Sequence, residues 1–253
     1  MKAMQRELPR LLEPMRKNGF LLMLDFDGVL APIVPHYKDA RMSAKTRRLL
    51  AACARRGKVA VISGRALADV RARVNLPGMW YAGNHGSEWS MGKARGCERL
   101  SKSAARQLRD ARDVFIALSK HYPGVVVEDK KLTFSVHFRA LPHSLRRSWR
   151  EQVRRIAKQY KKVLDTAEGS EYIFNVRTRS GRTKGDAVRL ARQLSPRRMV
   201  PIYIGDDTTD EDAFAALPRG ITIRVGRLHK SAARFFVDSR SEVDTILAML
   251  GEV

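Results

Sequence analysis

The chain has 253 residues, enough for one large domain or two smaller ones with a sizeable core. Hydrophobic residues make up 44% and charged residues 30%, as in an ordinary soluble globular protein. Lys and Arg number 49 against 26 Asp and Glu, a formal net charge of +23 that favours anionic ligands. General Arg enrichment of the source proteome would explain this charge equally well. Because the cations are spread along the chain rather than gathered in blocks, nucleic acid is not an expected partner.

The two cysteines, Cys53 and Cys97, exclude a disulfide framework and fit a reducing compartment. Charged residues interrupt the first 20 positions, so they do not form a secretory signal. No apolar run reaches the roughly 20 residues needed to cross a bilayer. We therefore expect a soluble, cytoplasmic protein with no membrane partner.

The first third of the chain alternates between strand and helix patterns. Residues 20–26 (FLLMLDF) form a compact apolar run, typical of a strand that is buried on both faces. Ser43 can cap a helix that Gly57 ends, and residues 58–62 (KVAVI) predict a second buried strand. A short helix and a strand near residues 79–82 follow. This alternation predicts a Rossmann-like α/β core with a parallel sheet.

The middle of the chain has a different pattern, a helix followed by a hairpin, and the pattern occurs twice. The polar sequences Glu-Asp-Lys-Lys and Glu-Gly-Ser-Glu are typical of the hairpin turns. We predict an inserted α+β module over residues 91–182, between core segments 1–90 and 183–253. The expected helices and hairpins of the module are, in chain order, residues 101–120, 125–138, 144–160 and 163–177.

The α/β pattern returns after the insertion. The expected elements are helix 184–194, strand 201–204, helix 209–217, strand 221–225 and helix 241–250.

Four polar segments follow expected strands or open a helix, and open parallel sheets bind ligands beyond the carboxyl ends of their strands. The first is Asp25-Phe26-Asp27-Gly28, whose two carboxylates can project into one site. One carboxylate can attack phosphorus while the other transfers the proton of the leaving group. A DxDG sequence alone can be surface decoration, but the apolar strand before Asp25 argues against that reading.

The second and third segments could contact phosphate. Ser63-Gly64-Arg65 offers a hydroxyl, backbone N–H groups and the start of a helix, although such a sequence alone is more often only a turn. Lys184 opens a helix and could neutralise phosphate charge, although a lone lysine there is usually a surface residue.

The fourth segment, residues 204–212, places five acids directly after a strand. In a cationic protein these acids repel one another unless a cation lies among them, and their hard oxygen ligands favour Mg²⁺. Helix capping by Thr209 or Asp210, with Glu211 and Asp212 complementing the helix dipole, is the alternative. That alternative does not account for Asp206.

In this order the four segments resemble the four motifs of the haloacid dehalogenase superfamily of phosphatases. IGDDTTDEDAF (204–214), AGNHGSEW (82–89) and VEDKKLTFSVHFR (127–139) resemble segments of trehalose-6-phosphate phosphatases, as do DFDGVLAPIV (25–34) and SGR. The matches run from residue 21 to 214. The resemblance implies a haloacid dehalogenase core with an inserted α+β cap.

The resemblance also implies roles at the phosphate. Asp25 would be the nucleophile, and Asp27 the acid for the leaving oxygen and then the base for water. Lys184 and Ser63, with Gly64 and Arg65 beside it, would hold the phosphoryl group. The Mg²⁺ ligands would be Asp25, Asp206 and the backbone carbonyl of Asp27, with Asp207 or Asp210 in support.

Further positions would contact the sugar. Glu128 and Lys130 match residues that grip sugar hydroxyls, and Asn84, His85 and Gly86 would line the boundary between core and cap. Val29 stands at the position after the glycine where these phosphatases commonly carry Thr. Asn175 stands where the family usually has the Glu of a Glu-x-Arg-Pro run, so it can bond a hydroxyl only without charge assistance.

We therefore expect an Mg²⁺-dependent phosphatase that converts trehalose 6-phosphate, a small-molecule sugar phosphate, to trehalose and phosphate through an aspartyl-phosphate. A phosphatase of another phosphorylated glycoside, of the glucosyl- or mannosyl-glycerate type, is the first alternative. A non-catalytic nucleic-acid or anion-binding protein is the second, but Asp25, Asp27 and Asp206 have no binding-only explanation.

Overall fold

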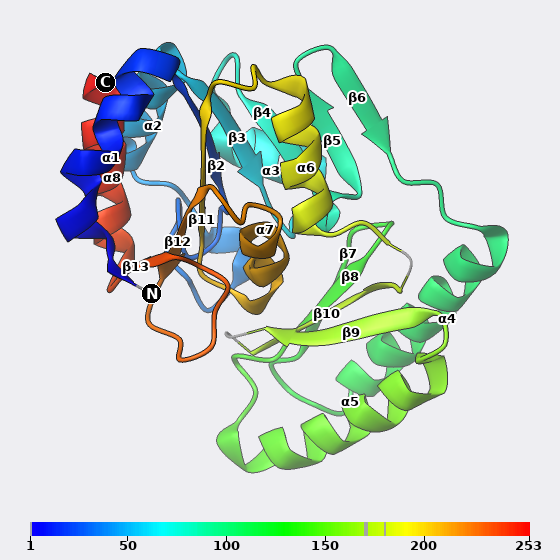
Figure 1. Ribbon diagram of the computed structural model, residues 1–253. Helices are drawn as coiled ribbons and strands as arrows, with labels where there is room; N and C mark the ends of the chain where they lie inside the picture. The colour runs from blue at the N-terminus through cyan, green and yellow to red at the C-terminus, as the bar shows by residue number, and fades with distance from the viewer. Residues whose placement is uncertain (1, 170–171, 180) are drawn as a thin grey trace. The chain divides into compact units, whose positions relative to one another are not determined.

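The computed structural model describes residues 2–169, 172–179 and 181–253. The chain divides into two compact units (Figure 1). The core unit comprises Met1–Cys97 and Arg182–Val253, and the inserted unit comprises Glu98–Gly181.

A mixed sheet forms the centre of the core unit. Its first seven described strands in spatial order, from β1 (Lys2–Ala3) across to β4 (Trp80–Gly83), are parallel to one another. Strands β5 and β6 extend it as an antiparallel hairpin beside β4. In spatial order the strands are β1 (Lys2–Ala3), β13 (Phe235–Val237), β12 (Ile221–Val225), β11 (Val200–Gly205), β2 (Phe20–Leu24), β3 (Lys58–Ile62), β4 (Trp80–Gly83), β5 (Glu88–Met91) and β6 (Ala94–Cys97).

Both faces of this sheet are buried by helices, which explains the uninterrupted apolar strands. Leu22 and Leu24 of β2 belong to one hydrophobic cluster, and Leu21 and Met23 to the cluster on the opposite face. Side chains alternate between faces along a strand, so each face needs its own helical cover. The first cluster is covered by α1 (Met4–Asn18), α2 (Ala44–Arg56), α3 (Leu67–Val74) and α8 (Arg240–Glu252), and the second by α6 (Lys184–Leu194) and α7 (Glu211–Ala215). Figure 1 shows α1, α2 and α8 on one side of β2 and α6 on the other.

Capping contacts fix where α2 begins and ends and where α6, which carries Lys184, begins. The Ser43 hydroxyl accepts from the Thr46 N–H at 3.0 Å at the start of α2, and the Gly57 N–H donates to the Cys53 carbonyl at its end. At the start of α6, Thr183 and Asp186 form a capping box. This box fixes the first turn of α6, where Lys184 lies.

The predicted start of the insertion is too early by seven residues. We expected the module to begin at residue 91, but Met91 ends β5 and residues 94–97 form β6 of the core sheet. The hairpin pairs with β4, so the inserted unit begins at Glu98. The helix α1 and the short strands β1, β5, β6 and β13 were not predicted.

The inserted unit packs two helices, α4 (Lys102–Ser119) and α5 (Arg146–Tyr160), on an antiparallel sheet. Its described strands lie in the order β7 (Val126–Asp129), β8 (Phe134–His137), β10 (Ile173–Thr178) and β9 (Leu164–Gly169). Phe134 and Val136 join Trp149 of α5 in the hydrophobic core of this unit. Part of the predicted second turn, residues 170–171, lies outside the described residues.

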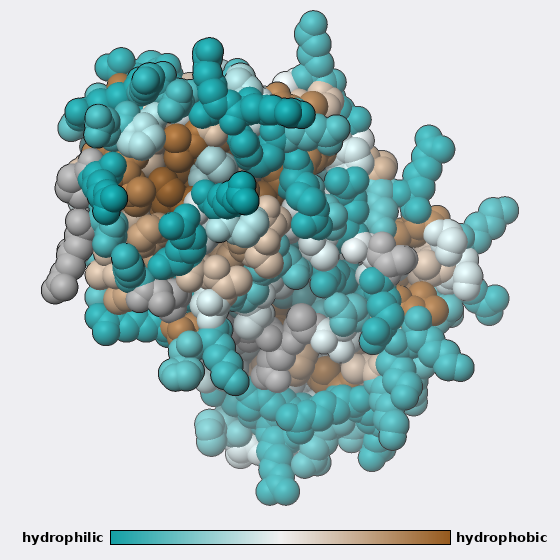
Figure 2. Space-filling view, in the orientation of Figure 1, coloured by the Kyte–Doolittle hydropathy of each residue, from teal (hydrophilic) through white to brown (hydrophobic). Residues whose placement is uncertain are grey.

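The charged composition is visible on the surface. On the face shown in Figure 2, hydrophilic side chains dominate and hydrophobic ones appear in limited patches. Among the helices of the described chain, none combines the length and apolar character needed to cross a bilayer.

Candidate active site

An ammonium group joins two carboxylates at the carboxyl end of β2. The Nζ of Lys184 donates to Asp25 Oδ2 at 2.6 Å and to Asp210 Oδ1 at 2.8 Å. Asp25 directly follows β2, and its N–H donates to the Ile204 carbonyl of β11 at 3.0 Å. All three charged side chains are buried, with at most 7% of any of them exposed. The fold therefore brings together residues from three distant segments of the chain.

Asp210 is the centre of this arrangement. Its Oδ1 also accepts from the Tyr203 hydroxyl at 2.6 Å, and its Oδ2 accepts from the backbone N–H groups of Asp206 at 3.0 Å and Asp207 at 2.9 Å. The carboxylate thus holds Lys184 on one side and shapes the loop after β11 on the other. Sequence reasoning gave Asp210 only a supporting or capping role. Gly205 allows this close approach, because a Cβ there would collide with the Asp210 side chain.

The cluster carries more negative than positive charge. Burial raises the pKa of Asp25 to about 7, with Lys184 opposing and Asp210 adding to the shift. Burial, together with Asp25 and Asp210, raises the pKa of Asp206 well above its usual range. Burial alone would lower the pKa of Lys184, but Asp210 and Asp25 raise it. Three carboxylates therefore share one ammonium.

This donor set fits a hard divalent cation. Carboxylate oxygens of Asp25, Asp206 and Asp210 lie within 4.8 Å of one another, and a cation would compensate their excess charge. Gly28 allows Asp206 to approach the loop after Asp25: its φ is 76°, and a Cβ there would collide with the Asp206 carboxylate. The side chain of Asp207 caps the short helix η4 (Thr208–Asp210), and its expected role as a metal ligand stays a prediction.

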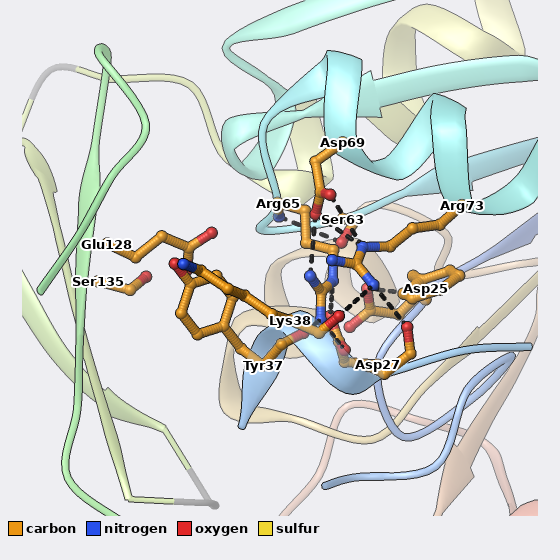
Figure 3. A network of polar contacts seen from close by, with 12 residues as sticks. Asp25, Asp27, Tyr37, Lys38, Ser63, Arg65, Asp69, Arg73, Glu128 and Ser135 are labelled. Atoms are coloured by element: carbon orange, nitrogen blue, oxygen red, sulfur yellow. Dashed lines mark hydrogen bonds and ion pairs between the residues drawn. The ribbon is translucent and has the colours of Figure 1, made fainter. Parts of the chain in front are cut away.

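Asp27 is held by Arg65 (Figure 3). The Nε and Nη2 groups of Arg65 donate to the two carboxylate oxygens of Asp27, each at 2.7 Å. Its Nη1 donates to Asp69 at 2.9 Å, and Asp69 also accepts from Arg73. Arg65 was expected to help hold phosphate, but its buried guanidinium is committed to orienting Asp27. Asp69 and Arg73 were missed by sequence reasoning.

The other expected phosphate-binding residues lie at the ends of β3 and β4. Ser63 is buried directly after β3, and its hydroxyl accepts from the Arg65 N–H at 3.2 Å. The His85 N–H donates to the Ser63 carbonyl at 3.0 Å, which ties the two strand ends together. Gly64 lies against the His85 ring, which a Cβ would displace.

Asn84 and Gly86 support these loops from within the core unit. The fully buried Asn84 donates its side-chain amide to Glu88, which also accepts from the Leu67 N–H at 3.3 Å. The backbone of Gly86, at φ 103°, lies against the Thr183 carbonyl just before Lys184. Glu88 was missed, and the expectation that residues 84–86 line a boundary with the cap stays a prediction.

The expected sugar-contacting residues form a polar network on the inserted unit. Lys130 Nζ donates to Ser135 Oγ at 2.6 Å, and Ser135 Oγ donates to Asn175 Oδ1 at 2.7 Å. His137 Nε2 lies 2.8 Å from Glu128 Oε2, which is 3.9 Å from Lys130 Nζ. The structure thus groups all three predicted residues of this unit and adds Ser135 and His137.

A mainly parallel core sheet with polar residues after β2, β3 and β11, in a chain that an α+β unit interrupts, defines the haloacid dehalogenase fold. A phosphatase of that superfamily from Bacteroides thetaiotaomicron superposes with a TM-score of 0.60 at 15% identity, covering 92% of this chain and 96% of that one. The C-terminal domain of Candida albicans trehalose-6-phosphate phosphatase superposes with a TM-score of 0.84 at 22% identity, covering 100% and 98%. The predicted fold class is therefore confirmed.

Sequence comparison identifies the family. The pattern of the trehalose-phosphatase family matches residues 23–241. A probable trehalose-phosphate phosphatase J of Arabidopsis thaliana is 30% identical over 262 residues, which cover 96% of this chain and 70% of that protein. The trehalose-phosphate phosphatase of Mycobacterium tuberculosis is 34% identical over 239 residues, covering 88% of this chain and 59% of that protein. The chain belongs to the trehalose-phosphatase family, as the sequence motifs predicted.

Proposed function

We propose that this protein hydrolyses trehalose 6-phosphate to trehalose and inorganic phosphate through an aspartyl-phosphate on Asp25. Membership of the trehalose-phosphatase family supports the substrate. The observation that carries the chemistry is the contact of Asp25 with the buried ammonium of Lys184 at the carboxyl end of β2. A carboxylate and a cation at this edge can hold and attack a phosphoryl group.

In the first step, a carboxylate oxygen of Asp25 attacks phosphorus and the bond between phosphorus and the sugar oxygen breaks. Asp27 gives its proton to that oxygen, which leaves as a hydroxyl. Arg65 contacts both oxygens of Asp27 and so orients this acid. Lys184 and the Ser63 hydroxyl orient the transferring group.

In the second step, water attacks phosphorus of the aspartyl-phosphate, which releases phosphate and restores the Asp25 carboxylate. Asp27 takes the proton of that water as a base. Arg65 donates to both carboxylate oxygens of Asp27, which holds this base in a fixed orientation. Arg65 therefore acts as a positioning residue for Asp27.

In the same proposal, Asp25, Asp206 and the backbone carbonyl of Asp27 would hold Mg²⁺. When bound, this ion would neutralise charge on the transferring phosphoryl group. The excess negative charge of the buried cluster supports this assignment. A cytoplasmic location, with Cys53 and Cys97 as free thiols, is also part of the proposal.

We further propose that the inserted unit acts as a cap whose Glu128, Lys130 and Asn175 bind the sugar. At position 175 an amide replaces the expected carboxylate. This substitution favours a second substrate class, phosphorylated glycosides of the glucosyl- or mannosyl-glycerate type.

A phosphate-release screen over sugar phosphates, with Mg²⁺ and with EDTA, tests the proposal. Trehalose 6-phosphate should be the best substrate, and Asp25→Asn should be inactive. Asp212→Asn is the matched control, because this exposed acid lies in the same acidic segment but outside the cluster. Full activity of Asp25→Asn would refute the mechanism, and preference for another glycoside phosphate would refute the substrate.

A further inference from the structure

A hydrogen-bonded chain crosses the polar face of the sheet in the inserted unit. It runs from Lys130 Nζ to Ser135 Oγ at 2.6 Å and from Ser135 Oγ to Asn175 Oδ1 at 2.7 Å. Ser135 of β8 lies directly opposite Asn175 of β10 in the antiparallel register, so both side chains project from the same face. Lys130 and Ser135 are buried, whereas Asn175 is partly exposed.

The chemistry of the three groups fixes the direction of this chain. An ammonium group can only donate, so Ser135 Oγ accepts from Lys130. The atom of Asn175 that contacts Ser135 is Oδ1, which can only accept, so the Ser135 hydroxyl donates its proton to it. The Nδ2 group of Asn175 is consequently turned away from Ser135. Within the described part of the chain, Nδ2 has no hydrogen-bond acceptor.

We propose that this hydrogen-bonded chain makes Asn175 a hydrogen-bond donor to the substrate, so that the inserted unit binds an acceptor oxygen of the sugar through the Asn175 amide. The inference rests on the proposed function for its substrate. A carboxylate at position 175, which the family resemblance led us to expect, could only accept. In this protein the side chain at position 175 therefore donates a hydrogen bond to the sugar, where a carboxylate would accept one. Ser135 is the residue that sets this orientation of the amide.

A consequence for substrate range follows. A sugar hydroxyl can satisfy either polarity because it both donates and accepts. An oxygen without a proton, such as that of a carboxylate, can be bound by the Asn175 amide but would be repelled by an acid there. The site thus tolerates phosphorylated glycosides that carry an acceptor without a proton where Asn175 makes contact.

The isosteric variant Asn175→Asp tests this polarity. We would measure kcat/KM for trehalose 6-phosphate and for analogues in which each hydroxyl of the unphosphorylated glucose is replaced in turn by fluorine, which accepts weakly and cannot donate. For each analogue we define the fluorine ratio as its kcat/KM divided by the kcat/KM of trehalose 6-phosphate. For one analogue, this fluorine ratio should be about tenfold or more lower in Asn175→Asp than in wild type. Equal ratios in both proteins for every analogue would overturn the proposal.

Ser135→Ala tests the residue that orients the amide. Without the Ser135 hydroxyl, the Asn175 amide can rotate, and the fluorine ratio should move toward that of Asn175→Asp. The control is Ser148→Ala on α5, whose hydroxyl contacts Tyr122 and the Leu145 carbonyl and which should leave the ratio unchanged. A wild-type ratio in Ser135→Ala would remove Ser135 from the proposal.

NMR exchange of the Asn175 side-chain amide tests the orientation without any substrate. The two Nδ2 protons are assigned by their absence in Asn175→Asp, and they should exchange rapidly with water. A slowly exchanging Nδ2 proton that Ser135→Ala abolishes would show the opposite orientation and overturn the proposal. A wild type that releases no phosphate from trehalose 6-phosphate would instead refute the proposed function, whatever the NMR result.

Discussion

Replacement of Asp210 by Asn is the sharpest test of how the core site is built. The Asp210 carboxylate is fully buried and accepts four hydrogen bonds, two on each oxygen. One oxygen faces Lys184 and Tyr203, and the other faces two backbone N–H groups. An amide keeps one oxygen but places an NH₂ group against a pair of donors, whichever way it is turned.

The expected loss in the free energy of unfolding can be estimated from these contacts. Two buried donors lose their acceptor, at about 1–3 kcal/mol each. Lys184 also loses one of its two carboxylate partners, and breaking a buried ion pair costs about 3–5 kcal/mol. Because the two effects overlap at Lys184, we expect a loss of about 3–5 kcal/mol in the free energy of unfolding, a large share of the roughly 5–15 kcal/mol typical of a folded domain.

Urea unfolding followed by circular dichroism at pH 7 in EDTA measures this loss. Asp212→Asn, an exposed acid two residues along, should stay within about 0.5 kcal/mol of wild type. We also expect kcat of Asp210→Asn to fall, because Lys184 loses one of the two groups that hold its ammonium. An Asp210→Asn variant within about 1 kcal/mol of wild type would refute the assignment of Asp210 as the organising residue.

Asp25→Asn should lower kcat by several orders of magnitude in phosphate-release assays while circular dichroism still shows a folded protein. Asp206→Ala should weaken Mg²⁺ binding in calorimetry, and unchanged affinity would argue against this ligand. Arg65→Lys cannot contact both oxygens of Asp27, so kcat should fall by up to about 100-fold with KM little changed. Burial raises the pKa of Asp25 from 3.8 to about 7, so in EDTA the folded protein keeps a proton that the unfolded chain releases. The urea midpoint should therefore fall as pH rises between these values, and a rising midpoint would contradict the assigned shift.

The sequence by itself determined the core sheet and the edge where the polar residues meet. The strand at 20–26 has no polar face, which indicates helices on both sides of a parallel sheet. Parallel strands end at a common edge, so polar residues after β2, β3 and β11 had to lie near one another. This is why Asp25, Ser63 and Asp206 could be named without coordinates.

Only the tertiary structure decided what Asp210 and Arg65 do. An acid at the start of a helix is equally suited to capping the helix, ligating a metal or pairing with a lysine, and the sequence does not show that Lys184 and Tyr203 lie beside it. Arg65 belongs to a sequence that predicted phosphate binding, yet its guanidinium contacts Asp27, 38 residues away, and Asp69 of α3. The short β5 and β6 also escaped prediction, because four-residue strands are too short to show a reliable alternation; β5 is stabilised by pairing with β4, and β6 by pairing with β5. The contacts of Asp210 with Lys184 and of Arg65 with Asp27 join residues far apart in the chain, and local patterns carry no record of them.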